Sequence, residues 1–137
     1  SGANNEQRQA LKQYGYHVGM AFQLVDDALD YEGDAETLGK NVGDDLAEGK
    51  PTLPLIYAME NSRAEQSQLI AKAIENGDVD QLDAIVTIVK DSGALDYTAS
   101  QARQQVSSAI AALDCLEDSK YRQAMADLAH FAIERAY

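Results

Sequence analysis

A long helical pattern near the start of the chain constrains the fold more than any other feature. From about Glu6 to Tyr31, apolar residues recur every three or four positions without a proline, which predicts one long amphipathic helix. At about 100° per residue, one broad stripe that we expect to face the core carries Leu11, Tyr14, Val18, Phe22, Val25 and Leu29. A helix of this length favours an all-α fold.

The rest of the chain reads as further helices, and we predict no strand. A glycine-punctuated loop is expected from Glu32 to Lys50. Five more helices are expected over about residues 52–60, 62–77, 78–93, 95–113 and 118–135. Ser62 with Glu65 would form a capping box, and Asp78 and Asp118 are predicted helix N-caps.

Composition narrows the possible partners and the compartment. The chain has 137 residues, enough for one domain, and a net charge of -12 with scattered basic residues. This argues against nucleic acid and anionic membrane surfaces, which attract clustered Lys and Arg. No apolar run approaches the roughly 20 residues that span a bilayer. Cys115 is the single cysteine, so no internal disulfide can form, and a cytoplasmic location is predicted.

The side of the first helix opposite the apolar stripe is acidic. Gln23, Asp26, Asp27 and Asp30 cluster there, and Gly19 lies about one turn before Asp26. Aspartates at this spacing repel one another in mid-helix, which costs stability. A solvated acidic face is one interpretation. The other is a site for a hard cation such as Mg²⁺, with Gly19 leaving space for a ligand.

The loop that follows supplies positive charge. Lys40 and Lys50 each follow a glycine and could approach a diphosphate closely, while Asp44 and Asp45 lie between them. Carboxylate, Mg²⁺, phosphate and lysine would then alternate in charge. A plain surface loop is the alternative interpretation of this segment taken alone.

These residues carry a resemblance to a known family. Residues 19–30, GMAFQLVDDALD, resemble the second aspartate-rich motif of the trans-isoprenyl diphosphate synthases. The Leu-Gly-Lys at 38–40, the Gly-Asp-Asp at 43–45 and the GKPTLP at 49–54 are similar to the segment that follows that motif. The wording from residue 49 onward most resembles the bacterial long-chain members, the octaprenyl diphosphate synthases in particular.

The resemblance implies the C-terminal helices of the all-α isoprenoid synthase bundle. It implies Mg²⁺-assisted ionisation of an allylic diphosphate, to which isopentenyl diphosphate adds. Asp26 would be the principal metal ligand, and Asp27 and Asp30 would bind the metal directly or through water. Lys40 would bind the leaving diphosphate, with Lys50 in support. Phe22 and Gln23 would border the reacting carbons, and a homodimer is expected at full length.

The sequence also departs from the family pattern. It holds one DDxxD motif, and neither the first aspartate-rich motif nor a basic cluster for isopentenyl diphosphate is present. We therefore expect a C-terminal part of a single synthase domain that is inactive alone, with product length set elsewhere. A class I terpene cyclase is a rival, although its Asn/Ser/Glu metal motif is absent. A non-catalytic subunit of a heteromeric synthase is another, although such a subunit would be expected to lack the aspartates.

Overall fold

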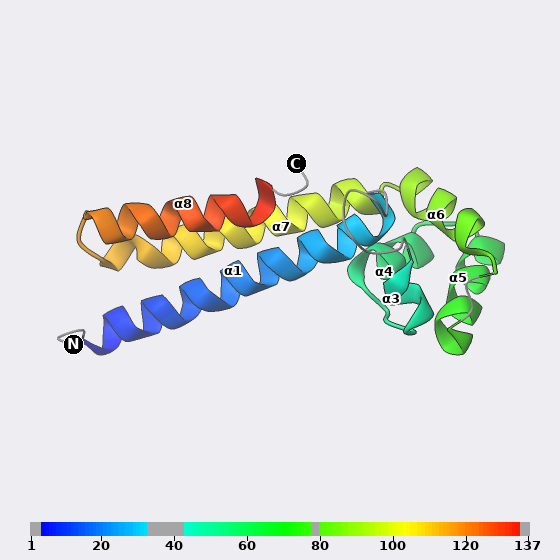
Figure 1. The fold of residues 1–137 in the computed structure, drawn as a ribbon, viewed down its shortest axis with the longest axis horizontal. Helices are drawn as coiled ribbons and strands as arrows, with labels where there is room; N and C mark the ends of the chain where they lie inside the picture. The colour runs from blue at the N-terminus through cyan, green and yellow to red at the C-terminus, as the bar shows by residue number, and fades with distance from the viewer. Residues whose placement is uncertain (1–3, 33–42, 78–79, 135–137) are drawn as a thin grey trace. The chain divides into compact units, whose positions relative to one another are not determined.

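The computed structural model describes residues 4–32, 43–77 and 80–134, and the described residues form helices and turns without a strand (Figure 1). The α-helices are α1 (Asn5–Glu32), α3 (Asp44–Ala47), α4 (Leu53–Glu60), α5 (Ala64–Asn76), α6 (Leu82–Asp91), α7 (Ala94–Ala112) and α8 (Lys120–Glu134). A short 3₁₀ helix, η1 (Leu113–Cys115), follows α7 directly. The predicted all-α class and all six predicted helices are confirmed. Helix α3 was not predicted and lies inside the expected loop.

Two of the predicted caps are wrong. Helix α5 begins after Arg63, whose backbone N–H donates to Gln66 Oε1 at 3.1 Å, so Gln66 performs the role assigned to Glu65. In α8 the Ser119 hydroxyl oxygen accepts the Arg122 N–H at 3.2 Å, one residue after the predicted Asp118. In each case the chain enters the helix one residue later than expected. Asp78 lies outside the described residues.

Among the described residues, compact unit 1 comprises 4–25 and 100–134. Its core packs α1 against α7 and α8 through Tyr14, Val18, Ala21, Val106, Ala109, Leu113, Ala129 and Ala132. The Tyr14 hydroxyl donates to the Met125 carbonyl at 2.9 Å, and His17 Nδ1 lies 2.7 Å from Gln105 Oε1. Alanines at the contacts let the helices approach closely, and in Figure 1 α7 and α8 run antiparallel.

Along α1 the buried stripe is displaced around the helix from the predicted one. Tyr14, Val18 and Val25 are buried, but Leu11 is 40% exposed. Phe22 and Leu29 are only partly buried. These three residues lie on one flank of the stripe, whereas the buried arc also takes in Ala21, Leu24 and Ala28. The small alanines were not counted as core positions in the sequence pattern.

Compact unit 2 comprises the described residues between 26 and 99. The end of α1 and helices α3 to α6 surround its core, together with the start of α7. The buried residues are Tyr31, Leu46, Leu55, Ala58, Ile70, Ala73, Ile85, Ile88, Val89 and Ala94. Tyr57 and Tyr97 stack with ring centroids 4.4 Å apart on the margin of this core. This unit contains most of the predicted site.

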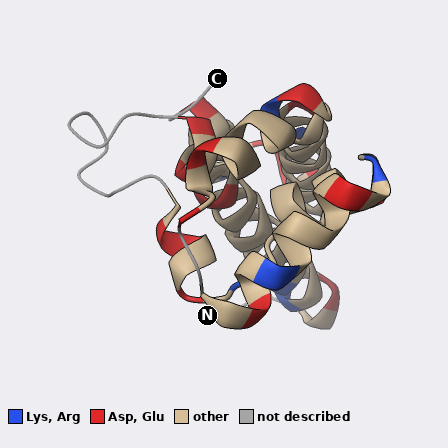
Figure 2. Ribbon diagram, turned by 90° about the vertical axis from the view of Figure 1, so that its right-hand side faces the viewer, with Lys and Arg blue, Asp and Glu red and all other residues tan. Residues whose placement is uncertain are grey.

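The surface chemistry agrees with the composition. Figure 2 shows Lys and Arg scattered over the described ribbon, without a continuous basic band. None of the helices in the described residues has the length and apolar character needed to cross a bilayer.

Candidate functional site

The three aspartates of α1 have three different environments. The residue is exposed at Asp26, partly buried at Asp27 and 0% exposed at Asp30. The sequence pattern placed all three on one acidic side of α1, and the structure buries Asp30 while Asp26 stays exposed. Helical spacing places Asp26 and Asp30 on the same side of the helix, but another segment covers only the later residue.

The segment that covers Asp30 is the start of α3. The Gly43 N–H donates to the Asp30 carbonyl oxygen at 3.2 Å, and the Asp45 N–H donates to Asp30 Oδ2, also at 3.2 Å. Side chain and main chain of one residue thus both bind the same short helix. A buried carboxylate needs such donors, because burying it without a hydrogen-bond partner costs about several kcal/mol of stability.

Three glycines allow α3 to pack tightly. Gly43, Gly49 and Gly77 have φ angles of 86°, 72° and 61°, in the left-handed region. A methyl group on Gly77 would lie 2.9 Å from the Ala47 carbonyl oxygen, and one on Gly49 would lie 3.0 Å from the Ile74 carbonyl oxygen. Backbone conformation and close packing against the end of α5 therefore account for the glycine at residue 49.

Lys50 lies directly after this turn and is paired with acids. Its Nζ lies 2.8 Å from Glu48 Oε2 and 3.7 Å from Asp45 Oδ1, while the side chain stays 57% exposed. The hydrogen bond and charge of Glu48, with the charge of Asp45, raise the pKa of Lys50 above its ordinary value. The cation is thus accessible and stays protonated, as a diphosphate ligand must be.

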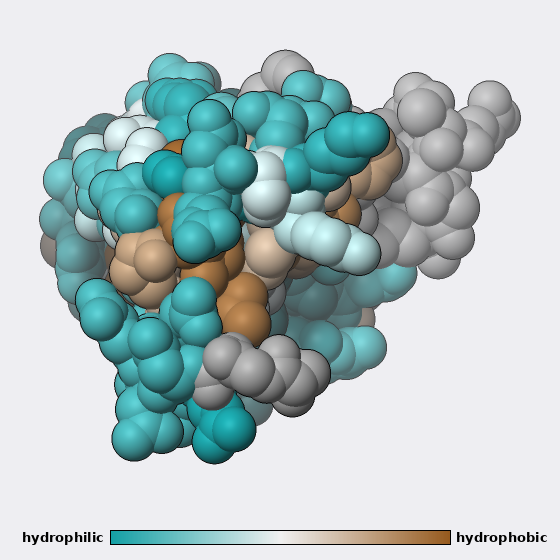
Figure 3. Space-filling model, turned by 90° about the vertical axis from the view of Figure 1, so that its left-hand side faces the viewer, coloured by the Kyte–Doolittle hydropathy of each residue, from teal (hydrophilic) through white to brown (hydrophobic). Residues whose placement is uncertain are grey.

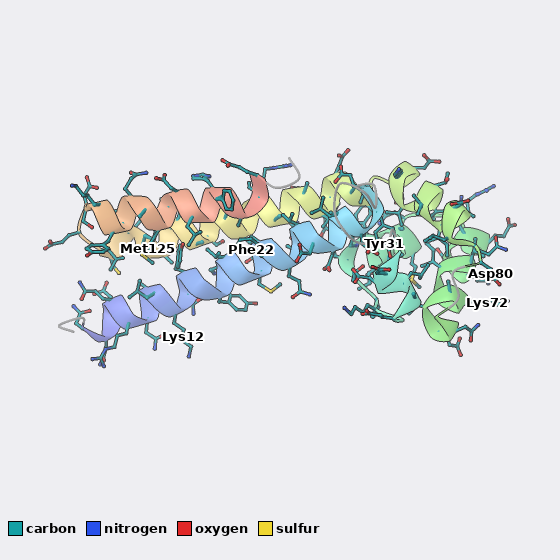
Figure 4. The ribbon with its side chains drawn as sticks, in the orientation of Figure 1. Lys12, Phe22, Tyr31, Lys72, Asp80 and Met125 are labelled. Atoms are coloured by element: carbon teal, nitrogen blue, oxygen red, sulfur yellow. The ribbon has the colours of Figure 1, made fainter. Side chains whose placement is uncertain are left out.

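Tyr31 anchors the end of α1 in the unit 2 core. Its side chain is 1% exposed, and Figure 4 shows it where α1 meets α4. Burial raises the pKa of the Tyr31 hydroxyl far above its ordinary value, and the charges of Asp30 and Asp45 act in the same direction. This hydroxyl therefore remains protonated and does not act as a base at neutral pH.

The remaining predicted residues are less informative. Phe22 packs partly buried against the unit 1 core, Gln23 is exposed on α1, and Lys40 lies outside the described residues. A methyl group built on Gly19 would meet no atom within 4 Å. No packing contact among the described residues therefore requires glycine at this position.

The carboxylates at the end of α1 suit a hard cation that is shared with a substrate. Among the described residues no three His, Cys, Asp or Glu side chains converge as a complete ligand group. Asp26 and Asp27 nevertheless offer carboxylate oxygens that burial does not fully enclose. Mg²⁺ is commonly held by one or two carboxylates, substrate phosphates and water, so this pair fits a shared site better than a closed cage.

Sequence reasoning missed the contact between Asp30 and Asp45. The two residues are 15 positions apart, and no helical or strand periodicity connects them. A glycine before two aspartates is weak evidence for a four-residue helix, because so short a helix has no apolar period to detect. The role of Asp30 therefore becomes visible only when α3 is placed.

Known sequences and structures match this chain over most of its length. The family described as polyprenyl synthetase matches residues 1–89. The all-trans-nonaprenyl-diphosphate synthase (geranyl-diphosphate specific) of Rhodobacter capsulatus is 50% identical over 95% of this chain and 40% of its own length. Octaprenyl diphosphate synthase of Haemophilus influenzae is 45% identical over 100% of this chain and 42% of its own.

Solved structures give the same family. Polyprenyl synthase from Caulobacter crescentus CB15, complexed with calcium and isoprenyl diphosphate, is similar with a TM-score of 0.88 and 40% identity over 99% of this chain and 42% of that one. A decaprenyl diphosphate synthase from Rhodobacter capsulatus has a TM-score of 0.88 and 38% identity over 99% of this chain and 42% of that one. The chain spans about two-fifths of the length of the relatives it matches. This chain belongs to the polyprenyl synthetase family.

Proposed function

We propose that this chain is the C-terminal part of a trans-polyprenyl diphosphate synthase, a prenyltransferase that condenses isopentenyl diphosphate with an allylic diphosphate. The observation that carries the proposal is the exposed Asp26 and half-buried Asp27 at the end of α1 in a chain of this family. The octaprenyl relatives at 45% and 46% identity support a long-chain product. We also propose that the full-length enzyme is a cytoplasmic homodimer.

Asp26 and Asp27 would hold the metal on this side of the substrate. The calcium and isoprenyl diphosphate in the Caulobacter relative support a divalent cation beside a diphosphate. Mg²⁺, when bound, would neutralise charge on the departing diphosphate as a Lewis acid. The two carboxylates would hold the cation beside the diphosphate. No nucleophilic side chain is needed, because the substrate itself ionises.

The cations of the chain would bind the same diphosphate. Lys50 is accessible and positively charged, which suits an electrostatic contact that strengthens as the leaving group gains charge. Lys40 would serve as a second contact, by resemblance to the family. Phe22 and Gln23, one turn before Asp26 on α1, would border the reacting carbons. This role is proposed by resemblance to the family.

A chimaeric enzyme tests the proposal. Residues 1–137 would replace the matching segment of the Haemophilus influenzae octaprenyl diphosphate synthase, to which they align over their whole length. We expect Mg²⁺-dependent incorporation of labelled isopentenyl diphosphate into a polyprenyl product. Replacing both Asp26 and Asp27 with asparagine should abolish it. A folded chimaera without transfer would refute the assignment, and one that stays active without both aspartates would favour a non-catalytic role.

A further inference from the structure

Asp30 differs from its neighbours in what its oxygens bind. The side chain is fully buried, and Oδ2 accepts the Asp45 N–H at 3.2 Å. The Asp30 carbonyl oxygen accepts the Gly43 N–H at the same distance. A ligand to a metal shared with substrate has to reach the open side of the helix, and Asp26 and Asp27 are the residues that do so.

Helix α3 lacks a cap of its own. Its N-cap residue is Gly43, which has no side chain, and no side-chain hydrogen bond from that position closes the helix. The first N–H groups of any helix lack partners within the helix and need an acceptor from elsewhere. The Asp30 carboxylate supplies that acceptor from 15 residues earlier in the chain.

Capping α3 also fixes Lys50. The Lys50 N–H donates to the Asp45 carbonyl oxygen at 2.9 Å, and Lys50 Nζ lies 3.7 Å from Asp45 Oδ1. Asp45 is therefore bound on one side by Asp30 and on the other by Lys50. A continuous set of contacts runs from the last turns of α1 to the exposed lysine.

We propose that Asp30 is a positioning residue: its carboxylate caps α3 and thereby sets where Lys50 lies, while metal binding on this helix is left to Asp26 and Asp27. This inference rests on the proposed function for its catalytic consequence. The cap itself does not depend on that function. Under this inference the property required of residue 30 is a hydrogen-bond acceptor.

Two substitutions separate an acceptor from a charge. Asparagine keeps a side-chain oxygen and caps helices as well as aspartate does, whereas alanine removes the acceptor. In the 137-residue chain, Asp30→Ala should speed amide hydrogen exchange at Asp45 by about five- to tenfold, the scale of a lost cap. Asp30→Asn should leave that exchange within about twofold. Asp83→Asn, an exposed residue on α6 with the same charge change, is the control. Equal exchange in all variants would overturn the cap.

Kinetics in the chimaera test the consequence. We expect Asp30→Ala to lower kcat/KM by about tenfold or more, and Asp30→Asn to stay within about threefold of the parent. The Mg²⁺ concentration that gives half-maximal activity should be the same in all three. A double-mutant cycle with Lys50→Ala should be non-additive, because both changes remove one contact set. A merely structural residue would not couple to Lys50.

The outcomes are distinguishable. Suppose that Asp30→Asn is as inactive as Asp30→Ala, that both variants leave amide exchange at Asp45 unchanged, and that both require more Mg²⁺. Asp30 would then be a metal ligand, and the proposal would be overturned. Additive losses for Asp30 and Lys50 would overturn the link to Lys50. An inactive parent chimaera would refute the proposed function, while the exchange measurements still decide whether Asp30 caps α3.

Discussion

Asp26 shows what exposure of a side chain contributes to function. It is exposed on α1, and the buried members of the unit 2 core are other residues. An aspartate in mid-helix, next to another aspartate, is unfavourable for the helix itself. We infer that the cost is offset by ligand binding in the proposed enzyme.

Asp26→Ala in the chimaera should lower turnover by about a hundredfold to a thousandfold, the scale of losing one preorganised electrostatic contact in a transition state. The melting temperature should stay the same or rise slightly, because alanine favours the helix and one like-charge repulsion disappears. Lys40→Ala should have a milder effect. Steady-state kinetics over a Mg²⁺ titration, with thermal melts, measure both. A loss of activity that follows unfolding would contradict a role in catalysis.

The buried Tyr31 makes stability sensitive to alkaline pH. Its pKa is raised by burial and by Asp30 and Asp45, so the folded chain keeps a proton that the unfolded chain loses above about pH 10. Unfolding then releases protons, and the free energy of unfolding falls as pH rises. Tyr31→Phe should flatten this fall in urea titrations between about pH 9 and 11. Burial also raises the pKa of Tyr14, so a smaller dependence of the unfolding free energy on pH should remain in this variant.

At the scale of elements, the helices were predictable because their information is local. The apolar period of α1 extends over 28 residues, so its existence and bounds followed from the sequence. Helix α3 has four residues and depends on Asp30 and on the end of α5, so its cause lies outside its own sequence. The burial of Asp30 was missed for the same reason. The pairing of Lys50 with Glu48 needed the turn after α3.

Two glycine substitutions separate structural from functional glycine. Gly77→Ala should destabilise the chain by about 1–2 kcal/mol or more, because residue 77 has a φ of 61° and the methyl would lie 2.9 Å from the backbone oxygen of Ala47. Gly19→Ala should instead stabilise it by about 0.5–1 kcal/mol, because the residue is helical and a methyl meets no atom within 4 Å. Urea unfolding measures both changes.

The same Gly19→Ala change has a second expected result in the chimaera. If the space beside Asp26 receives substrate, the methyl group should lower kcat/KM although the fold gains stability. A variant that is both more stable and fully active would contradict our interpretation of this glycine. Gly15→Ala, which also meets no atom within 4 Å and lies one turn earlier on α1, is a matched comparison.

At the scale of the whole molecule, unit 1 exposes apolar side chains on α8. Tyr121, Leu128 and Phe131 are 84%, 50% and 54% exposed, and helical spacing places them within about 80° of one another. Figure 3 shows further apolar surface at the end of unit 1, rimmed by hydrophilic residues. Apolar side chains gathered on one face mark a surface that another element or chain covers.

We therefore expect the 137-residue chain alone to associate with itself. We also expect it to lack prenyl transfer activity, because its aspartates supply metal ligands from one side only. Leu128→Glu with Phe131→Glu should reduce association, since charged side chains on a contact face must lose water to be buried. Both residues are half exposed, so the double change should shift the melting temperature little. His130→Glu, which changes an exposed α8 residue that is not one of these apolar side chains, is the control. Sedimentation and a transfer assay give the readouts. Robust elongation by the isolated chain would mean that these residues suffice for the site. Equal association of the double variant and the control would mean that another face makes the contact.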